Sequence, residues 1–323
     1  MTGEARDARM GVAVVNYNTR DHLHACLASV TAAGAREVVV VDNGSTDGSA
    51  EMVRRDFAGV LLHVDHSNPG YGAGANRAIA LCASPYVLLL NSDTLLRPGA
   101  LAALARYLDE HPRAGVVGPR LVNLDGSLQP SCRAFPSPLV PLHRQESLGR
   151  VARHLPLLGD RYLAAWPHTH ARVVPWVVGA ALALRREAMD AVGGFDESFF
   201  MYSEEIDLSY RMRRHGWETH FAPVTDVVHA GGASTKQYHA AMSAQLFLSS
   251  LHFYERHFSG ARLAQAVFMT RLSILARLVR DRVRLRAARD AATRERLAEN
   301  LSVWRRVLLD SGPRRRPAAA RGG

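Results

Sequence analysis

Four short apolar runs, separated by segments with helical periodicity, constrain the fold of this chain more than any other feature. The runs are rich in Val and Leu and begin at Gly11, Glu37, Val60 and Tyr86. Strands that are apolar at nearly every position are typical of parallel sheets buried on both faces. Each intervening segment has the length of one crossover helix. The amino-terminal third of the chain is therefore predicted to form consecutive βαβ units.

Each predicted strand ends in polar side chains. They are Asn16 and Asn18, Asp42 and Asn43, Asp65 and His66, and Asn91 and Asp93. In an open parallel sheet the ligand crevice lies beyond the carboxyl ends of the strands, so these groups should converge on one site. Asn, Asp and Ser also favour turns and helix caps, so any single one has a structural alternative. Four successive sets favour a nucleotide site.

Two of the connecting segments have features that suit a nucleotide. In VVDNGSTDGS, Asp42 can accept a hydrogen bond from the imide N–H of uracil or thymine, and Ser45 or Thr46 is predicted to cap the next helix. In NPGYGAGANRA, glycines such as Gly72 let the backbone approach a ligand, and Arg77 offers donors to a phosphate. This glycine-rich turn matches neither a P-loop nor the dinucleotide fingerprint.

The segment NSD ends the most apolar of the four runs. Asn91 and Asp93 place two oxygen-bearing side chains where they can reach a divalent cation held by a diphosphate. Mg²⁺ typically takes few protein ligands and leaves positions for substrate phosphates. As a bare pattern NSD is common in turns, so the structural alternative stays open for both residues.

An acidic cluster lies in FFMYSEEIDLSYR, where Glu204, Glu205 and Asp207 open a helix that Ser203 is predicted to cap. Acidic residues in a first helical turn are favoured by the helix dipole without any catalytic role. Asp207 and Arg211 are four residues apart and are predicted to form a structural pair. The apolar residues before the helix would exclude water and raise the pKa of a neighbouring carboxylate.

Together these motifs resemble a family 2 glycosyltransferase of the GT-A fold, and they are most similar to bacterial rhamnosyltransferases of cell-wall and polysaccharide synthesis. The matching segments, which span roughly Gly11 to Thr235, are VVNYN, VVDNGSTDGS, NPGYGAGANRA, LLLNSD, VGAALALRR, GGFDESFFMYSEEIDLSYR and HAGGAS. The resemblance implies an α/β fold with a GT-A, Rossmann-like, mostly parallel sheet flanked by helices, followed here by a helical extension.

The resemblance also implies roles for individual residues. The nucleotide-sugar is expected to contact Asn16, Asn18, Asp42, Asn43, Gly72, Arg77 and Asn91. Asp93 matches the second acid of the metal-binding D-x-D motif, whose first acid is replaced here by Asn91. His229 matches a histidine that completes the metal site in some relatives, although a structural role is an equal alternative. The implied cofactor is a divalent cation, Mg²⁺ or Mn²⁺, and an imidazole ligand would favour Mn²⁺.

Transfer of a sugar to an acceptor hydroxyl requires a carboxylate that takes the hydroxyl proton. Direct attack from the opposite face inverts the anomeric centre. By resemblance the base lies in the pair that Glu204 and Glu205 occupy. Glu205 is the predicted base and Glu204 would help orient the donor or the acceptor, while Asp207 is assigned to structure. The choice between Glu204 and Glu205 stays open at this point.

Changes of pattern divide the chain. Residues 1–10 are predicted to be an amino-terminal tail and residues 11–235 the GT-A catalytic domain. Within that domain the proline-rich segment 131–172 has the character of a lid or an acceptor-binding loop. Residues 236–311 are predicted to form a helical basic extension, and residues 312–323 a disordered tail.

The positive charge of the chain is concentrated in this extension. The whole chain carries a net charge of +10, whereas the part from Arg256 onward has 17 arginines against five acidic residues. A basic amphipathic helix suits an anionic membrane surface. Packing on the catalytic domain or on a second copy in a homo-oligomer is the alternative. The predicted apolar side consists of Leu263, Val267, Ile274 and Leu278, with Leu275 and Val279 beside them.

The predicted activity is inverting transfer of a sugar, L-rhamnose from dTDP-rhamnose, to a glycan or a polyprenyl-diphosphate-linked acceptor. One alternative is a sugar-1-phosphate nucleotidyltransferase, which has a similar sheet, although this chain lacks the long Gly- and Arg-rich loop that binds a triphosphate. Another is a non-catalytic protein whose basic tail binds nucleic acid or a membrane. For the transferase no nucleic-acid partner is expected. The start MTGEARDARM lacks the pattern of a secretory signal, so a cytoplasmic location is predicted, on the inner face of the membrane if the basic helix binds lipid.

Overall fold

The computed structural model describes residues 9–137, 166–231 and 239–310. These residues form two compact units. We call them the sheet unit, residues 9–135 with 166–231, and the helical unit, which contains the three helices of residues 239–310. The division falls after Gln237, close to the predicted end of the catalytic domain. The predicted disordered tail and most of the predicted lid segment lie outside the described residues.

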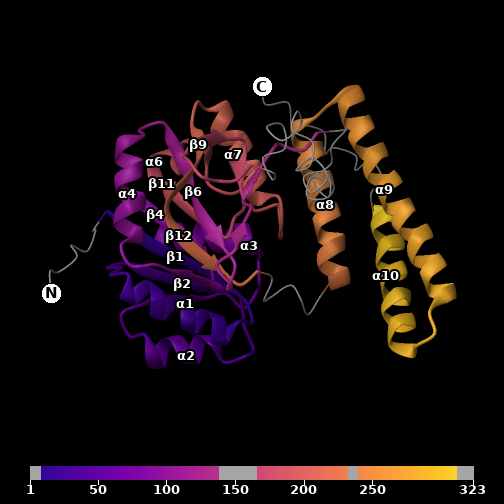
Figure 1. Ribbon diagram of the computed structural model, residues 1–323, viewed down its shortest axis with the longest axis horizontal. Coiled ribbons are helices and arrows are strands. Elements are labelled where there is room, and N and C mark those ends of the chain that lie inside the picture. Colours follow the sequence, from indigo (N-terminus) through magenta and orange to yellow (C-terminus); the bar gives the residue numbers. More distant parts are fainter. Residues whose placement is uncertain (1–8, 138–165, 232–238, 311–323) are drawn as a thin grey trace, which may run out of the picture. The chain divides into compact units, whose positions relative to one another are not determined.

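The sheet unit is built on a ten-stranded mixed sheet, whose main path is β3-β2-β1-β4-β11-β6-β12-β5 (Figure 1). Its first four strands along this path are parallel to one another. They are β1 (Met10–Asn16), β2 (Val38–Asp42), β3 (Leu61–Val64) and β4 (Tyr86–Asn91). The predicted strands and the βαβ organisation are confirmed.

The other half of the sheet mixes strand directions. β11 (Ala181–Arg185) lies antiparallel between β4 and β6 (Ala114–Val122). β12 (Glu218–His229) runs parallel to β6, and β5 (Thr94–Leu96) pairs antiparallel with β12. Short strands complete the unit: β7 (Leu128–Gln129) on β6, β9 (Arg172–Val174) on β12, and the separate pair β8 (Cys132–Arg133) and β10 (Trp176–Val177). β11 begins beside the carboxyl end of β4, because Ala181 pairs with Leu90.

Helices cover both faces of the sheet. One face carries α1 (Arg20–Ala32), α2 (Ser49–Asp56) and α4 (Ala100–Glu110). The other carries α3 (Tyr71–Leu81), α6 (Arg186–Val192) and α7 (Glu204–Arg214). Successive residues of β1 alternate between the two cores, Val12 and Val14 in the first and Ala13 and Val15 in the second. The burial of the central strands on both faces explains why the sequence shows apolar runs instead of alternation.

The predicted cap of α2 is wrong. The helix begins at Ser49, and Gly48 precedes it with φ of 82°. Asp47 Oδ1 accepts hydrogen bonds from the Ser49 N–H at 3.1 Å and from its hydroxyl at 2.6 Å. Ser45 and Thr46 lie too early in the chain to cap this helix, because the turn after β2 runs to Gly48 and is held by its own contacts.

The helical unit consists of α8 (His239–His257), α9 (Gly260–Ala287) and α10 (Ala291–Asp310), which confirms the predicted helical extension. Phe247, Ile274 and Trp304 meet in its buried core. The Arg277 guanidinium lies over the rings of Phe247 and Trp304, at 5.2 and 5.3 Å from their centroids. Among the helices of the described ranges, none combines the length and apolarity that a membrane span requires.

The predicted apolar side of α9 faces into this core and not outward. Ile274 is fully buried and Leu278 packs against the same cluster. Leu275 and Val279, which the sequence analysis placed beside that side, are exposed. The helix therefore has a second apolar row on its outer face. A periodicity count cannot separate two such rows, because it does not reveal which side of the helix the neighbouring helices cover.

Candidate active site

A chain of buried hydrogen bonds joins the carboxyl ends of β1, β2 and β4. Asn16 Nδ2 donates to Asp42 Oδ2 at 2.7 Å, and Thr19 Oγ1 donates to Asn16 Oδ1 at 2.7 Å. The Thr19 and Ser92 hydroxyls are 2.7 Å apart. Asp42 is only 1 % exposed. The polar ends of β1, β2 and β4 therefore converge by binding one another, whereas the Asp65 side chain after β3 accepts hydrogen bonds from Ser67.

The turn after β2 closes over this chain. The Ser45 N–H donates to Asp42 Oδ1 at 2.7 Å, and Asn16 Nδ2 also reaches Ser45 Oγ at 3.1 Å. Asn18 Oδ1 accepts from the Thr46 N–H at 2.8 Å. Asn16, Asn18 and Asp42 thus hold the turn in place. Their contact with a nucleotide stays a prediction, and in this conformation Asn16 supports Asp42 instead of facing solvent.

Asn43 and the glycine-rich turn bind each other closely. Asn43 Nδ2 donates to the Gly70 carbonyl at 3.0 Å, and a Cβ at Gly74 would lie 3.0 Å from Asn43 Oδ1. A Cβ at Gly72 would lie 3.8 Å from the Glu204 Cβ. The absence of side chains at Gly72 and Gly74 lets protein segments approach α3. Nucleotide contacts of Gly72 and Asn43 stay predictions.

Arg77 and Asn91 lie apart from these contacts. Arg77 is exposed on α3, where its charge acts on Asp65 after β3. The Ser67 hydroxyl and amide donate to Asp65 and are the main cause of its lowered pKa. Asn91 is half-buried at the end of β4, and its N–H donates to the Ala180 carbonyl at 2.9 Å. Their predicted contacts with the donor are not tested by this geometry.

The two predicted metal ligands lie together. Asp93 Oδ1 is 3.3 Å from His229 Nε2, and the side chains are 10 % and 11 % exposed. The antiparallel register of β5 and β12 causes this proximity, because it pairs Thr94 with His229. The Ala230 N–H also donates to the Asp93 carbonyl at 3.0 Å. One carboxylate and one imidazole form a donor set that a divalent cation can use.

Gln129, which the sequence analysis did not identify, completes this arrangement. Its Oε1 is 2.7 Å from His229 Nδ1, and its Nε2 donates to Asn123 Oδ1 at 3.1 Å. Within residues 9–137, 166–231 and 239–310 no cluster of three or more His, Cys, Asp or Glu side chains suits a metal ion. A cation at Asp93 and His229 would therefore take its other ligands from water or from a substrate.

The paired glutamates open α7. Glu204 is 7 % exposed and Glu205 is half-buried, and the Oε2 atom of each is buried without a hydrogen-bond partner in the described part of the chain. Burial raises the pKa of Glu205 from 4.5 to about 7. Burial, and then the charge of Glu205, raise the pKa of Glu204 well above its usual value. Burial therefore favours the protonated form of both carboxyl groups, and the choice of Glu205 as the base stays a prediction.

The predicted cap of α7 is also wrong. Ser203 adopts the left-handed conformation, with φ of 71°, and makes no side-chain cap hydrogen bond. Its hydroxyl is buried without a partner among the described residues. Tyr202 also has a positive φ, of 66°. This backbone course turns the Ser203 hydroxyl away from the first amides of the helix, which explains why the usual preference for serine at this position fails.

Tyr71, at the start of α3, is close enough to the acidic pair and to Asp93 for their charges to act on its phenol. Its hydroxyl donates to the Gly179 carbonyl at 3.3 Å, and a Cβ at Gly179 would lie 3.7 Å from Glu205. Burial raises the pKa of Tyr71, and the charges of Glu204, Glu205 and Asp93 raise it further. The pKa of Tyr71 therefore responds both to the predicted catalytic pair and to the predicted metal ligand Asp93. The sequence offered only an aromatic residue in a glycine-rich turn, which did not indicate this role.

Residues 8–248 match the model of the family described as glycosyltransferase like family 2. The chain belongs to this family. The match covers the whole described sheet unit. The acidic pair, Tyr71, Asp93 and His229 therefore all lie within it.

Curated relatives of this glycosyltransferase include rhamnosyltransferases. The chain is 34 % identical over 260 residues to the N-acetylglucosaminyl-diphospho-decaprenol L-rhamnosyltransferase of Mycobacterium tuberculosis, covering 75 % of this chain and 84 % of the relative. It is 21 % identical over 236 residues to the rhamnosyltransferase WbbL of Escherichia coli K12, covering 68 % and 82 %.

Solved glycosyltransferases share the fold. The mannosyltransferase PcManGT of Pyrobaculum calidifontis, in complex with GDP-Man and Mn²⁺, has a TM-score of 0.53 and 19 % identity, over 94 % of this chain and 84 % of that one. GalNAc-T7 with UDP, GalNAc and Mn²⁺ has a TM-score of 0.52 and 18 % identity, over 68 % of this chain and 43 % of that longer one. The predicted GT-A fold is confirmed.

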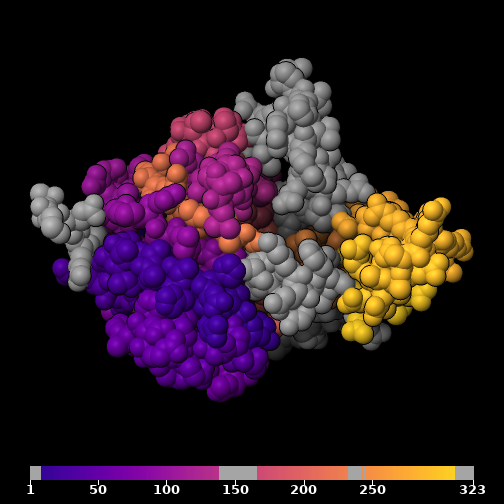
Figure 2. All heavy atoms as spheres, turned by 60° about the horizontal axis from the view of Figure 1, so that its bottom comes forward, coloured from indigo at the N-terminus to yellow at the C-terminus, as the bar shows by residue number. Residues whose placement is uncertain are grey.

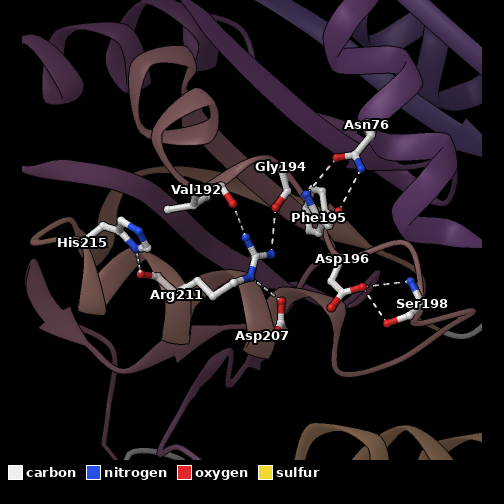
Figure 3. A network of polar contacts seen from close by, with 9 residues as sticks. All are labelled: Asn76, Val192, Gly194, Phe195, Asp196, Ser198, Asp207, Arg211 and His215. Carbon is white, nitrogen blue, oxygen red and sulfur yellow. Dashed lines mark hydrogen bonds and ion pairs between the residues drawn. The ribbon is translucent and has the colours of Figure 1, made fainter. Parts of the chain in front are cut away.

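In this glycosyltransferase the third acid of α7 is structural, as predicted. Arg211 Nε donates to Asp207 Oδ2 at 2.7 Å, and its other nitrogens donate to the Val192 and Gly194 carbonyls, also at 2.7 Å (Figure 3). The Asp207 side chain is 1 % exposed. Arg211 thus fixes the turn that follows α6 to the helix that carries the glutamates.

The loop between that turn and α7 is held from α3 as well. The Asn76 side chain donates to the Phe195 carbonyl at 2.9 Å and accepts from the Phe195 N–H at 2.8 Å. Asp196 Oδ1 accepts from the amide and hydroxyl of Ser198 (Figure 3). Glu204 and Glu205 are therefore positioned by a helix and a loop that are both anchored.

Removing the Arg211 guanidinium should destabilise the protein strongly. Arg211→Met removes the Arg211 hydrogen bonds from the buried Asp207 carboxylate and from two carbonyls, so the free energy of unfolding should fall by about 3–5 kcal/mol. Arg213→Met is the matched control, because Arg213 is exposed on the same helix, and it should change the free energy by less than about 0.5 kcal/mol. Urea denaturation measures both. Equal losses would contradict a structural role for the Asp207–Arg211 pair.

Proposed function

We propose that this chain is an inverting glycosyltransferase that moves L-rhamnose from dTDP-L-rhamnose to a polyprenyl-diphosphate-linked sugar. The named activity of the relative that is 34 % identical supports the sugar and the lipid-linked acceptor. The observation that carries the chemistry is the buried pair Glu204–Glu205, in which Glu205 has a pKa of about 7.

In the proposed reaction Glu205 acts as the base. Its carboxylate takes the proton of the acceptor hydroxyl, while the oxygen attacks the anomeric carbon of the donor. The bond from that carbon to the phosphate oxygen breaks, and its electron pair leaves with the nucleoside diphosphate. A single displacement of this kind inverts the anomeric centre. A base with a pKa near 7 is half ionised at neutral pH and remains basic enough to accept the proton.

Glu204 and Tyr71 would assist without accepting that proton. Burial raises the pKa of Glu204 and so favours its protonated form, which can donate a hydrogen bond to an oxygen of the donor or acceptor. The Tyr71 hydroxyl remains protonated for the same reason.

Asp93 and His229 are the proposed ligands of a divalent cation, with Mn²⁺ favoured by the imidazole. The cation would supply positive charge to the diphosphate of the donor. Two structural neighbours that were solved with Mn²⁺ support this choice. The carboxyl ends of β1, β2 and β4, with Asp42 and Asn91, are the proposed nucleoside side of the site. A water-soluble donor and a lipid-linked acceptor meet at a membrane surface, which we take to be its cytoplasmic face.

A donor panel tests the proposed activity. The full chain, with Mn²⁺ or Mg²⁺ and a polyprenyl-diphosphate N-acetylglucosamine acceptor, should transfer rhamnose from dTDP-L-rhamnose at least about 10-fold faster than sugars from UDP donors. NMR of the product should show the anomeric configuration opposite to that of the donor. Release of pyrophosphate from a sugar-1-phosphate and a nucleoside triphosphate would instead identify a nucleotidyltransferase. Retention of configuration would contradict the single displacement.

Replacement of the base should separate chemistry from binding. Glu205→Gln should lower the single-turnover rate by about 10²–10⁴-fold, because the amide cannot accept the proton, and should leave donor affinity nearly unchanged. The unmodified enzyme should lose activity as pH falls through about 7, since Glu205 is then protonated. Glu187→Gln, at an exposed glutamate of α6, is the control and should transfer normally. Near-normal transfer by Glu205→Gln would exclude it as the base.

A further inference from the structure

The outer face of α9 carries a continuous apolar row. The row consists of Phe268, Leu272, Leu275, Val279 and Val283, each between 45 % and 64 % exposed. At about 100° per residue these positions fall within an arc of about 80°, and they extend over about 22 Å of helix. Figure 2 shows part of the surface of the helical unit, coloured orange to yellow. Isolated exposed apolar residues are ordinary, but a row along one helix marks an interaction surface.

The inner face of the same helix is more polar than this row. Thr270, Ser273 and Asp281 are buried there together with Ala266 and Ile274. A helix that buries hydroxyl groups and exposes leucine, valine and phenylalanine does not minimise its free energy in water alone. The outer row therefore requires an apolar environment of its own.

The charges around the row indicate what supplies that environment. α9 contains seven arginines and one acidic residue, Asp281, which is buried and bound to Arg280 at 2.8 Å. Arg282 and Arg286 are exposed where the row ends. We propose that the outer face of α9 lies in the surface of an anionic phospholipid bilayer, with its apolar row among the acyl chains and Arg282 and Arg286 at the phosphates.

A second copy of the chain fits this surface less well. Two α9 helices packed along their rows would bring many arginines together, and α9 has no exposed acidic residue to pair with them. Nucleic acid would match the charge but would leave the apolar row in water. Anionic lipid complements both features. The apolar row and its arginines are independent of the catalytic residues. The inference rests on the proposed lipid-linked acceptor only for the reason why the enzyme would bind a membrane.

Vesicle binding by the full chain tests the lipid surface. The chain should sediment with phosphatidylcholine vesicles that contain roughly 30 % phosphatidylglycerol, and at least about 10-fold less with phosphatidylcholine alone. Leu272→Glu combined with Val279→Glu should reduce binding at least about 10-fold, because it places charges among acyl chains. Arg286→Gln should weaken it about fivefold. Leu124→Glu, at an exposed leucine of the sheet unit, is the matched control and should bind normally.

Two results would overturn this proposal. One is an unmodified chain that does not sediment with the anionic vesicles. The other is light scattering that shows a dimer which Leu272→Glu with Val279→Glu converts to a monomer, since a second copy would then cover the row. Neither result would affect the transferase, whose activity is measured with a short-chain acceptor in the absence of vesicles.

A separate observation concerns the imidazole of His229. A directed series of hydrogen bonds leads to it from the turn between β6 and β7. The Ser127 hydroxyl donates to Asp125 at 2.6 Å, so its oxygen accepts from Asn123 Nδ2 at 2.9 Å. Asn123 Oδ1 then faces Gln129 Nε2, which leaves Gln129 Oε1 directed at His229 Nδ1. Each acceptor in the series is fixed by the donor before it.

We infer that Gln129 is a positioning residue that selects the tautomer of His229. An amide oxygen at 2.7 Å requires a proton on Nδ1, so the lone pair of the neutral imidazole lies on Nε2, the atom nearest Asp93. That atom is then available to a cation. Without Gln129 the proton can move to Nε2, which would then donate a hydrogen bond to Asp93. Neither proposed ligand would then be available to a cation. This inference deepens the proposed cation site and rests on it for its function.

Two measurements test Gln129. Nitrogen-15 NMR of His229 in the free protein should show the Nδ1–H tautomer, and Gln129→Leu should shift it to Nε2–H. Mn²⁺ binding followed by electron paramagnetic resonance with dTDP present should weaken about 10–100-fold in Gln129→Leu. Gln129→Glu keeps an oxygen acceptor and should retain the tautomer. Gln245→Leu, which removes an amide from α8, is the control and should change neither measurement.

An Nε2–H tautomer in the unmodified protein would overturn this inference, as would unchanged Mn²⁺ affinity in Gln129→Leu. The two measurements distinguish failure of the Gln129 inference from failure of the proposed cation site. If the unmodified protein shows the Nδ1–H tautomer but binds no Mn²⁺, the cation site is wrong, while the effect of Gln129 on the imidazole stands.

Discussion

Parallel pairing of β1 with both β2 and β4 is the constraint on which the site depends. The register places Asn16 beside Asp42 and Val15 beside Asn91, so the three strands end at the same edge. Helices cover both faces of this sheet, and polar groups can therefore collect only beyond its edge. The antiparallel pairing of β5 with β12 then adds Asp93 and His229 to that edge. Strand register, more than any loop, thus brings the two proposed ligands together.

The acidic pair is costly for the fold. Between pH 4.5 and about 7 the folded protein binds more protons than the unfolded chain, because burial raises the pKa of Glu205. Stability must therefore decrease as pH rises through this range. The Arg211 contacts and the Asn76 contacts with Phe195 hold the loop and helix that carry the pair. This anchoring explains how neighbouring buried carboxyl groups persist, because the surrounding structure offsets the cost of a carboxyl group whose pKa is about 7.

Much of the sheet and the acidic pair could be predicted from the sequence, because apolar runs and residue types report burial directly. Contacts between distant residues could not. Gln129 and His229 are 100 positions apart, and the pairing of both β7 and β12 with β6 brings them to 2.7 Å. Ser203 failed as a cap because its left-handed backbone overrides the preference of serine for that position. The outer row of α9 was only partly identified, since helical periodicity does not reveal which face the neighbouring helices cover.

The electrostatics of the site favour a cation independently of any motif. Besides burial, the carboxyl groups of the acidic pair and of Asp93 raise the pKa of Tyr71, so the two predicted halves of the site act on one phenol. A nucleoside diphosphate is itself anionic and would be repelled by an ionised Glu205 and Asp93. Arg77, the cationic side chain predicted to assist, is exposed on α3, where its charge acts on Asp65. A divalent cation at Asp93 and His229 would remove this repulsion and leave Glu205 free to accept a proton.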